Sequence, residues 1–398
     1  MRVATQVVRW GALITLAVVA IPAVPGLALL LVAETTRGRL VGALVALGLV
    51  ALVALLDGGR SRVRRRIVTI AGSGVALGVL VLAASSARSA ASTHVDRDAH
   101  HVEVARLASD ARIELLSVGP RASAWSVPVD VVPERDLLRV GLTFAALADP
   151  QLDRTEVRSL LAHVHAASDA VDALFGAERP SALGLGAARL FGARGDPEHR
   201  FVVRPTASAT VARTGVVVLH GAGGNLACLL GALAPLAARD QVVLAHPSFG
   251  LGRWDEPGGL DAIEGARRWL VEREGVAPDR VFLVGLSNGA LGVSRAAIDA
   301  PDRWAGIGFV SPVFDDRVVA GEPFAEAWRG RPVWIWTGEA DDRVPASYVR
   351  GTARGLARRG VDAELEVVEG LDHFAWLESP DRLRAALRAW IRTAQRSR

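Results

Sequence analysis

Lysine is absent from this chain of 398 residues, so all 46 basic side chains are arginine. Together with the abundance of alanine, glycine and valine, this bias indicates a GC-rich bacterial genome more than any function. The single cysteine, Cys228, excludes a disulfide within the chain, so a domain outside the cytoplasm must rely on its packed core. Cys228 lies in a stretch that we expect to be helical, where it is a small core residue and not a nucleophile.

A motif for binding nucleic acid is also missing, although the sequence pI is about 10.5. Residues 1–84 hold nine arginines and two acidic residues, a net charge of +7, whereas the remainder of the chain has a net charge of −3. The basic excess is therefore confined to the N-terminal region, where arginine orients membrane helices. We expect no nucleic-acid partner.

The N-terminal region contains three nearly uncharged apolar segments, Gly11–Ala33, Leu40–Leu56 and Ile67–Ala84. Their lengths are close to the roughly 20 residues that a helix needs to cross a bilayer. No polar face recurs in them at helical spacing, which argues against buried helices of a soluble domain. We predict three transmembrane helices and an integral membrane protein.

The first apolar segment has an alternative interpretation. Pro22, Pro25 and Gly26 interrupt it, and Arg2 and Arg9 precede it, as in a secretory signal peptide. Cleavage of this segment would leave two membrane helices. The side of the membrane predicted for the C-terminal region is the same in both cases.

The placement of arginine predicts the topology. The connection between the second and third segments holds five arginines against Asp57, whereas the first connection holds Arg37 and Arg39 against Glu34. By the positive-inside rule, the richer connection is cytoplasmic. The N-terminus is then cytoplasmic, and everything after Ala84 lies outside the cytoplasm. The five arginines are Arg60, Arg62, Arg64, Arg65 and Arg66.

An apolar run typical of a β-strand, Val281–Leu286, leads into the pentapeptide Gly285-Leu-Ser-Asn-Gly289 and then into a segment compatible with a helix. A serine hydroxyl is a poor nucleophile, and a strained turn from strand to helix presents it beside a base and backbone donors. The two glycines keep such a turn free of side-chain clashes. Because the pentapeptide is weak evidence in a glycine-rich chain, the interpretation depends on its partners.

Upstream, the strand-like run Gly215–Leu219 opens into His220-Gly-Ala-Gly-Gly224. The backbone of this glycine-rich loop can direct the Ala222 N–H toward an oxyanion, and Asn288, which follows the serine, can supply a second N–H. We interpret His220 as a structural histidine of the loop and not as a catalyst.

Downstream, the apolar strand Pro332–Gly338 is followed by adjacent carboxylates, Asp341 and Asp342, and His373 lies in a loop after the last strand. A carboxylate just past the carboxyl end of a strand is where a triad acid is expected. The order along the chain is therefore serine, aspartate, histidine.

With these motifs in place, the segment from about residue 186 to residue 398 resembles the α/β-hydrolases. Two sequence motifs are similar to those of the esterase, polyhydroxyalkanoate-depolymerase and dienelactone-hydrolase-like branches. They are Leu-His-Gly-Ala-Gly-Gly-Asn and Asp-Arg-Val-Phe-Leu-Val-Gly-Leu-Ser-Asn-Gly. The resemblance covers a little over half of the chain. It implies Ser287 as nucleophile, His373 as general base, and the amides of Ala222 and Asn288 as oxyanion hole.

The resemblance favours Asp341 as the triad acid. The pattern Gly-x-x-Asp-x-x-Val-Pro fits Gly338, Asp341, Val344 and Pro345, and Asp342 remains the alternative. Asp372 is adjacent to His373 in sequence, and neighbours seldom reach the geometry that orients an imidazole.

The remaining pattern predicts an α/β fold, a doubly wound and mostly parallel sheet with the active site at the carboxyl ends of the strands. The amphipathic stretches Leu260–Glu274 and Tyr348–Arg359 suit crossover helices, Pro380–Gln395 suits a final helix, and His199–Pro205 suits an early antiparallel strand. The expected parallel strands are Val242–Ala245, Val281–Leu286, Gly306–Val310, Val333–Trp336 and Leu365–Val368.

Residues 85–185 are predicted to form a mainly helical region, either a separate subdomain, a cap over the active site or a spacer. Helical patterns cover Val102–Leu116, Glu134–Leu147 and Thr155–Phe175, and Trp125–Val132 suits an extended piece. The histidines of this region do not share a helix face, so we expect no metal site and no cofactor. These histidines are His94, His100, His101, His163 and His165.

We therefore predict a membrane-anchored serine hydrolase outside the cytoplasm that cleaves a small-molecule or lipid-like carboxylic ester through an acyl-enzyme. An envelope acyltransferase or a peptidase with the same triad, and a catalytically silent binding protein, remain alternatives. Trp254, Phe374 and Trp376 either line an acyl pocket or pack in the core. The sequence leaves the acyl length and the oligomeric state open.

Overall fold

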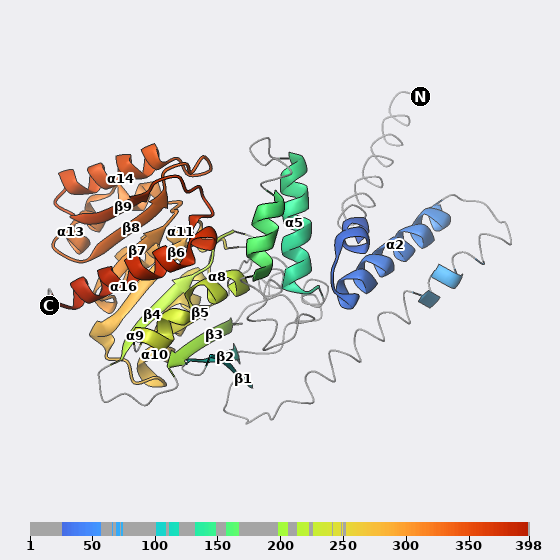
Figure 1. Cartoon of the computed structure of the whole chain (residues 1–398), viewed down its shortest axis with the longest axis horizontal. Coiled ribbons are helices and arrows are strands. Elements are labelled where there is room, and N and C mark those ends of the chain that lie inside the picture. Colours follow the sequence, from blue (N-terminus) through green and yellow to red (C-terminus); the bar gives the residue numbers. More distant parts are fainter. Residues whose placement is uncertain are drawn as a thin grey trace, which may run out of the picture. The chain divides into compact units, whose positions relative to one another are not determined.

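The computed structural model describes most of the C-terminal half of the chain and shorter parts of the N-terminal half (Figure 1). The described residues are 26–56, 66, 69–71, 73–74, 101–108, 111–118, 132–148, 157–166, 198–205, 213–222, 226–240, 242–247, 249 and 252–396. They belong to two compact units. The N-terminal unit contains the described residues of 26–74 and 132–148, and the sheet unit contains all the others.

Within the described residues of the sheet unit, nine strands form one sheet in the order β1-β2-β3-β5-β4-β6-β7-β8-β9 (Figure 1). The six strands from β5 to β9 run parallel, and β1, β2 and β3 are antiparallel to their neighbours. The antiparallel strands are β1 His101–Ala108, β2 Ala111–Val118 and β3 Glu198–Pro205. The parallel strands are β4 Thr214–Leu219, β5 Val242–Pro247, β6 Val281–Leu286, β7 Gly306–Val310, β8 Val333–Gly338 and β9 Ala363–Val368.

Every residue of β4, β5, β6, β7 and β8 is buried, because helices cover both faces of the parallel sheet. On one face, the strands pack against α10 Gly259–Glu272, α11 Gly289–Asp299, α13 Glu322–Trp328 and α14 Ala346–Arg358. On the other face lie α8 Leu226–Leu233, α9 Pro235–Asp240 and α16 Pro380–Arg396. Short helices complete the unit: η1 Pro278–Arg280, η2 Pro301–Arg303, α12 Asp316–Val319 and α15 Ala375–Glu378.

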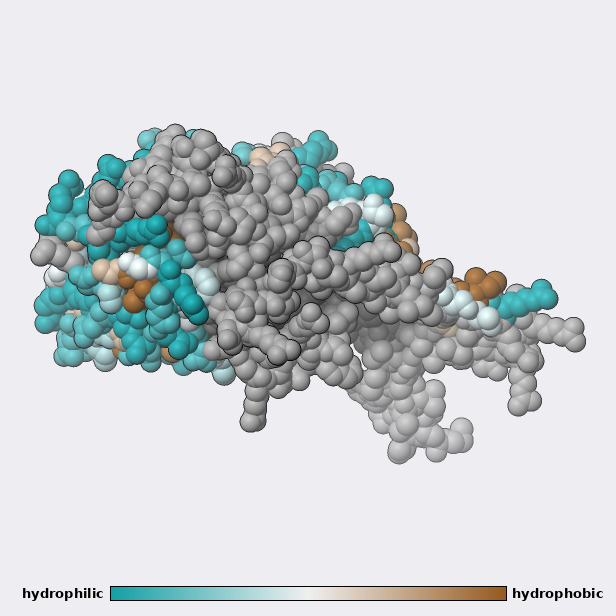
Figure 2. Space-filling view, turned by 90° about the horizontal axis from the view of Figure 1, so that it is seen from below, coloured by the Kyte–Doolittle hydropathy of each residue, from teal (hydrophilic) through white to brown (hydrophobic). Residues whose placement is uncertain are grey.

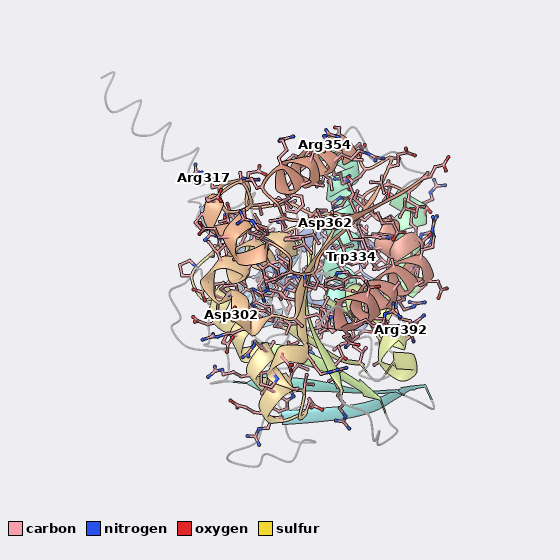
Figure 3. All side chains as sticks on the ribbon, turned by 90° about the vertical axis from the view of Figure 1, so that its left-hand side faces the viewer. Asp302, Arg317, Trp334, Arg354, Asp362 and Arg392 are labelled. Carbon is pink, nitrogen blue, oxygen red and sulfur yellow. The ribbon has the colours of Figure 1, made fainter. Side chains whose placement is uncertain are left out.

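The helices α10, α14 and α16 bury one face and are amphipathic, as their patterns predict. Trp334 of β8 lies in the middle of the unit in Figure 3 and stacks on Trp390 of α16 with ring centroids 5.6 Å apart. The labelled charged side chains Arg317, Arg354 and Arg392 lie at the periphery of the same view. The predicted α/β class is confirmed for this unit, which has a six-stranded parallel sheet with helices on both faces.

One prediction for residues 85–185 is wrong. The expected helix over Val102–Leu116 is instead the hairpin of β1 and β2, and β2 pairs with β3. The physical reason is the alternation of apolar and polar residues, with Val102 and Val104 in β1 and Ile113 and Leu115 in β2, which fits a sheet edge better than a helix face. The hairpin extends the sheet, so residues 101–108 and 111–118 are strands, whereas residues 134–148 and 157–166 of the same region are helical.

Other predictions for the region fare differently. The helix expected over Glu134–Leu147 is confirmed as α5, Glu134–Ala148. Residues 157–166 are helical, within the expected Thr155–Phe175, whose remainder lies outside the described residues. Most of the expected extended piece Trp125–Val132 also lies outside them. The boundary near residue 186 stays a prediction, since parts of residues 85–185 belong to each unit.

The N-terminal unit contains the helix α2, Thr36–Leu56, a helix over residues 26–32, and α5. Leu29, Ala33, Val132 and Val140 form its buried centre. Several large apolar side chains of this unit are exposed, and hydrophobic residues appear in brown on the right of Figure 2. The exposed side chains are Leu27, Leu30, Leu31, Leu47, Val50 and Ile70.

The helix α2 contains the predicted second apolar segment, Leu40–Leu56. Most of the first and third segments, Gly11–Ala33 and Ile67–Ala84, lies outside the described residues. In the part of the chain that the structure describes, none of the helices combines the length and the hydrophobicity that a membrane crossing requires.

Candidate active site

Ser287 stands directly after β6 in the left-handed backbone region, with φ of 49°. A residue with a Cβ adopts this conformation only at a cost, so the surrounding structure must impose it. The Ser287 N–H donates to the Val310 carbonyl at 2.8 Å, and the Ser287 carbonyl accepts the Ala290 N–H at 2.9 Å. The predicted turn from strand to helix is therefore present, and α11 begins two residues after the serine.

The two glycines of the pentapeptide are required by close approach. A Cβ on Gly285 would lie 2.5 Å from the Gly289 carbonyl oxygen, and a Cβ on Gly289 would lie 2.5 Å from the Leu219 carbonyl oxygen. Both obstacles are backbone atoms, which cannot rotate away. The first turn of α11 is thereby held against the end of β4, where the glycine-rich loop begins.

His373 connects the serine to a carboxylate. Its Nε2 lies 3.2 Å from Ser287 Oγ, and its Nδ1 lies 2.8 Å from Asp341 Oδ2. Because the carboxylate can only accept a hydrogen bond when ionised, it favours the tautomer with the proton on Nδ1. The Nε2 of that tautomer is free to accept a proton from Ser287.

The structure distinguishes the three candidate acids. The side chain of Asp341 is fully buried, and its Oδ1 accepts the N–H groups of Arg343 at 3.1 Å and Val344 at 2.8 Å. Asp342 is exposed. The carboxylate of Asp372 accepts the Phe374 N–H at 2.6 Å, a local turn contact. Asp341, the acid that the sequence favours, is the one that reaches His373.

The loops that carry the acid and the histidine interlock. The Glu339 N–H donates to the Val368 carbonyl at 2.8 Å, and the Ala340 N–H donates to the Leu371 carbonyl at 2.9 Å. A Cβ on Gly338 would fall on the carbonyl oxygens of Leu371 and Asp372. The glycine at the end of β8 therefore lets the two loops come close enough for the 2.8 Å contact.

The expected oxyanion donors are both available. Among the described residues, neither the Ala222 N–H nor the Asn288 N–H has an acceptor within the protein. Asn288 is the N-cap residue of α11, so the positive end of that helix dipole also favours negative charge beside the Asn288 N–H. Residues 223–225 of the glycine-rich loop lie outside the described part of the chain.

His220 has the structural role predicted for it. It is fully buried, its Nδ1 donates to the Gly221 carbonyl at 2.9 Å, and its Nε2 accepts the Phe249 N–H at 2.9 Å. Burial lowers the pKa of His220 to about 4, so the ring is neutral near pH 7. The histidine ties the loop after β4 to the chain after β5 and supports the segment that carries Ala222.

The three aromatic residues proposed for a pocket differ in exposure. Trp254 is fully buried, and its Nε1 donates to the His220 carbonyl at 2.8 Å, so it is core packing and offers no surface to a substrate. Trp376 is 3% exposed and is therefore also buried in the core. Phe374 is partly exposed, with its ring edge-on to His373 at 5.6 Å, and its place in a pocket stays a prediction.

No family model and no curated protein matches the chain. Among solved structures, a predicted CIB-like hydrolase from Thermoplasma acidophilum is 17% identical, with a TM-score of 0.39 over 49% of this chain and 93% of its own. Est1E from Butyrivibrio proteoclasticus is 14% identical, with a TM-score of 0.42 over 51% of this chain and 96% of its own. FphF, a fluorophosphonate-binding serine hydrolase of Staphylococcus aureus, is 14% identical, with a TM-score of 0.41 over 50% of this chain and 92% of its own.

Proposed function

We propose that this chain is a serine hydrolase that cleaves carboxylic esters through an acyl-enzyme. The observation that carries the proposal is the hydrogen-bonded path from Ser287 Oγ through His373 to Asp341, with distances of 3.2 and 2.8 Å. The nucleophile stands on a strained turn, and among the described residues the N–H groups of Ala222 and Asn288 have no acceptor. Such a set of groups fits acyl transfer.

The proposed reaction begins with attack of Ser287 Oγ on the ester carbonyl while His373 Nε2 takes the hydroxyl proton. The N–H groups of Ala222 and Asn288 stabilise the oxyanion of the tetrahedral intermediate. His373 then gives its proton to the departing alcohol, which leaves the acyl group on the serine. Water activated by His373 releases the acid, and Asp341 remains ionised throughout and orients the imidazole.

The proposal that the substrate is an ester is supported by the sequence motifs around His220 and Ser287, which resemble those of esterase branches of the α/β-hydrolases. Transfer of the acyl group to an alcohol, and cleavage of peptides, need the same groups. A series of p-nitrophenyl esters of increasing acyl length tests the proposal on the purified full chain in detergent, with added alcohol and a peptide substrate as further arms.

The matched variants for this assay are Ser287→Ala and Asp342→Asn. We expect Ser287→Ala to lose roughly 10³-fold or more of kcat/KM, because the acyl acceptor is removed. Asp342→Asn keeps wild-type activity, because that carboxylate is exposed and the acid bonded to His373 Nδ1 is Asp341. Equal activity of the wild type and Ser287→Ala contradicts the proposal.

We also propose that the sheet unit lies outside the cytoplasm on a membrane anchor formed by the N-terminal segments. Apart from the arginine distribution, one set of contacts within the N-terminal unit supports this topology. The N–H of Glu34 and the hydroxyl of Thr35 donate to the buried carboxylate of Asp136 in α5, at 2.7 and 2.5 Å. Glu34 also pairs with Arg135 and Arg139.

These contacts join the connection between the first two apolar segments to residues that follow the third. Two segments in contact lie on the same side of a membrane, and the arginine rule assigns both to the outside. Labelling of intact cells with a membrane-impermeant maleimide tests the topology in a Cys228→Ala background with Arg354→Cys on the exposed side of α14. We expect labelling before lysis, and labelling only after lysis contradicts the proposed side.

A further inference from the structure

Ser311, the residue after β7, shares an unusual backbone conformation with Ser287. Among the described residues other than glycine, only these two serines have a positive φ, 42° at Ser311 and 49° at Ser287. A side chain in the left-handed region is strained, and such strain persists where the surrounding structure holds it. The triad and the oxyanion donors do not include Ser311, so its strain needs another explanation.

The segment around Ser311 holds the peptide groups on both sides of Ser287. The Ser287 N–H donates to the Val310 carbonyl at 2.8 Å, and the Val313 N–H donates to the Ser287 carbonyl at 3.1 Å. Pro312, between Ser311 and Val313, has no N–H to contribute. The left-handed turn at Ser311 therefore redirects the chain so that Val310 and Val313 both bond to the same residue.

Ser311 is itself fixed to the strand that leads to the acid. Its N–H donates to the Trp336 carbonyl at 2.8 Å, which continues the parallel pairing of β7 and β8 by one residue. In this register Ser311 lies opposite Thr337, and β8 leads through Gly338 to Asp341. The turn at Ser311 thus connects the nucleophile strand to the strand that carries the acid.

Packing does not account for a serine at this position. The side chains of Ser311 and Thr337 are fully buried, and within the described residues neither hydroxyl has a hydrogen-bond partner. A small apolar side chain would fill the same space without an unsatisfied hydroxyl. The hydroxyl makes no contact that explains the turn, so the feature that points to a function is the strained backbone of Ser311.

We propose that Ser311 is a positioning residue for Ser287. Its left-handed conformation sets the two hydrogen bonds that fix the backbone of the nucleophile, from the Ser287 N–H to the Val310 carbonyl and from the Val313 N–H to the Ser287 carbonyl. These bonds fix the position of Ser287 Oγ relative to His373. This inference rests on the proposed role of Ser287 as nucleophile. It predicts that activity depends on how readily residue 311 adopts a positive φ, and not on its hydroxyl.

Three substitutions in the full chain test this dependence. Ser311→Val opposes the left-handed conformation most, because a β-branched residue is an outlier there. Ser311→Ala opposes it less, and Ser311→Gly accepts it freely while also removing the hydroxyl. Leu356→Ala is the control for loss of stability, since Leu356 is fully buried in α14, away from the triad contacts.

We expect Ser311→Val to lower kcat and the rate of fluorophosphonate labelling by on the order of 10²-fold, with KM nearly unchanged, because a displacement of about 1 Å at a reacting atom has an effect of that size. For Ser311→Ala we expect values of kcat and labelling rate between those of Ser311→Val and the wild type. For Ser311→Gly we expect values close to those of the wild type. Leu356→Ala lowers Tm and leaves kcat unchanged. In hydrogen exchange, the amide of Val313 exchanges faster in Ser311→Val than in the wild type.

The inference is overturned if Ser311→Val and Ser311→Ala react at the wild-type rate, or if Ser311→Gly loses as much as they do. The exchange measurement separates this inference from the proposed function. If Ser287 of the wild type does not react with the fluorophosphonate, the proposed function is wrong. If the amide of Val313 also exchanges at the wild-type rate in Ser311→Val, the positioning role is wrong as well. If Ser311→Val does not fold, the comparison of Ser311→Ala with Ser311→Gly decides.

Discussion

Asp341 Oδ2 lies 2.8 Å from His373 Nδ1, and this contact is buried, with the carboxylate fully shielded and the imidazole side chain 11% exposed. Two backbone N–H groups hold the other carboxylate oxygen, so the acid has a fixed orientation. A buried, ionised acid of this kind selects the imidazole tautomer and stabilises the imidazolium that forms during the reaction.

Asp341→Asn is expected to lower kcat by about 10⁴-fold with little effect on KM. The amide keeps the shape of the carboxylate but can hold the histidine in the wrong tautomer. Steady-state kinetics on a p-nitrophenyl ester measures the loss, with the neighbouring Asp342→Asn as the control. Comparable losses in both variants would show that His373 is not oriented by Asp341.

Gly289→Ala is expected to reduce activity, and to lower the free energy of unfolding by about 1–3 kcal/mol. The added methyl group would lie 2.5 Å from the Leu219 carbonyl oxygen, so the turn or the end of β4 must move. Gly351→Ala is the matched control, because its Cβ in α14 would meet no atom within 4 Å. There alanine raises stability by about 0.5–1 kcal/mol through helix propensity. Urea unfolding compares the two, and a neutral Gly289→Ala would refute the close approach.

The stability of the sheet unit is expected to fall as the pH drops below about 6.5. Burial lowers the pKa of His220 to about 4 and that of His246 to about 3, and the charge of His220 adds a smaller effect at His246. Between these values and the unfolded pKa of about 6.5, the unfolded state binds protons that the folded state does not. Each histidine then contributes a slope of up to about 1.4 kcal/mol per pH unit.

His246→Gln tests this pH dependence. Neither ring nitrogen of His246 has a hydrogen-bond partner among the described residues, so the substitution removes a titrating group without breaking a side-chain hydrogen bond there. Urea unfolding followed by tryptophan fluorescence at several values between pH 7 and pH 5 should show a shallower slope in the variant, by close to one proton. Parallel slopes in the two proteins would rule out His246 as a source of acid sensitivity.

Trp254→Phe is expected to lower stability by roughly 1–3 kcal/mol and to leave the dependence of activity on acyl length unchanged. The indole Nε1 donates to the His220 carbonyl, and its loss leaves a buried acceptor without its partner. The ring itself is fully buried, so we expect it not to contact the acyl chain of the substrate. A changed preference for acyl length would instead indicate that Trp254 lines the pocket.

Much of the site could be predicted from the sequence because each catalytic group follows a strand with a strong local pattern. The run before Ser287 is apolar throughout, which is typical of a strand buried on both faces, and the same holds for the strand before Asp341. Parallel strands bring their carboxyl ends to one edge, so their order alone places the serine, aspartate and histidine together.

Other features could not be read in this way. The β1 and β2 segments alternate apolar and polar residues as strands do, but their alanine, leucine, arginine and glutamate also suit helices, and the pairing with β3 favours strands. The strain at Ser311 leaves no mark in the sequence except a following proline, because it arises from contacts with Ser287 and Trp336 on other strands. The burial of Trp254 likewise depends on ring contacts with His220, which is distant in sequence, and with Phe249, which lies in a loop.

The proposed mechanism requires that Ser287 itself becomes acylated, and a quenched reaction can trap that adduct. The purified full chain is mixed with a p-nitrophenyl ester, quenched in acid and digested with trypsin, and the Val281–Arg295 peptide is sequenced by mass spectrometry. The acyl-enzyme mechanism predicts an acyl adduct on Ser287 and none on Ser294 of the same peptide, whose buried hydroxyl donates to the Ala290 carbonyl. Ester hydrolysis without an adduct, and at the same rate in Ser287→Ala, would contradict it.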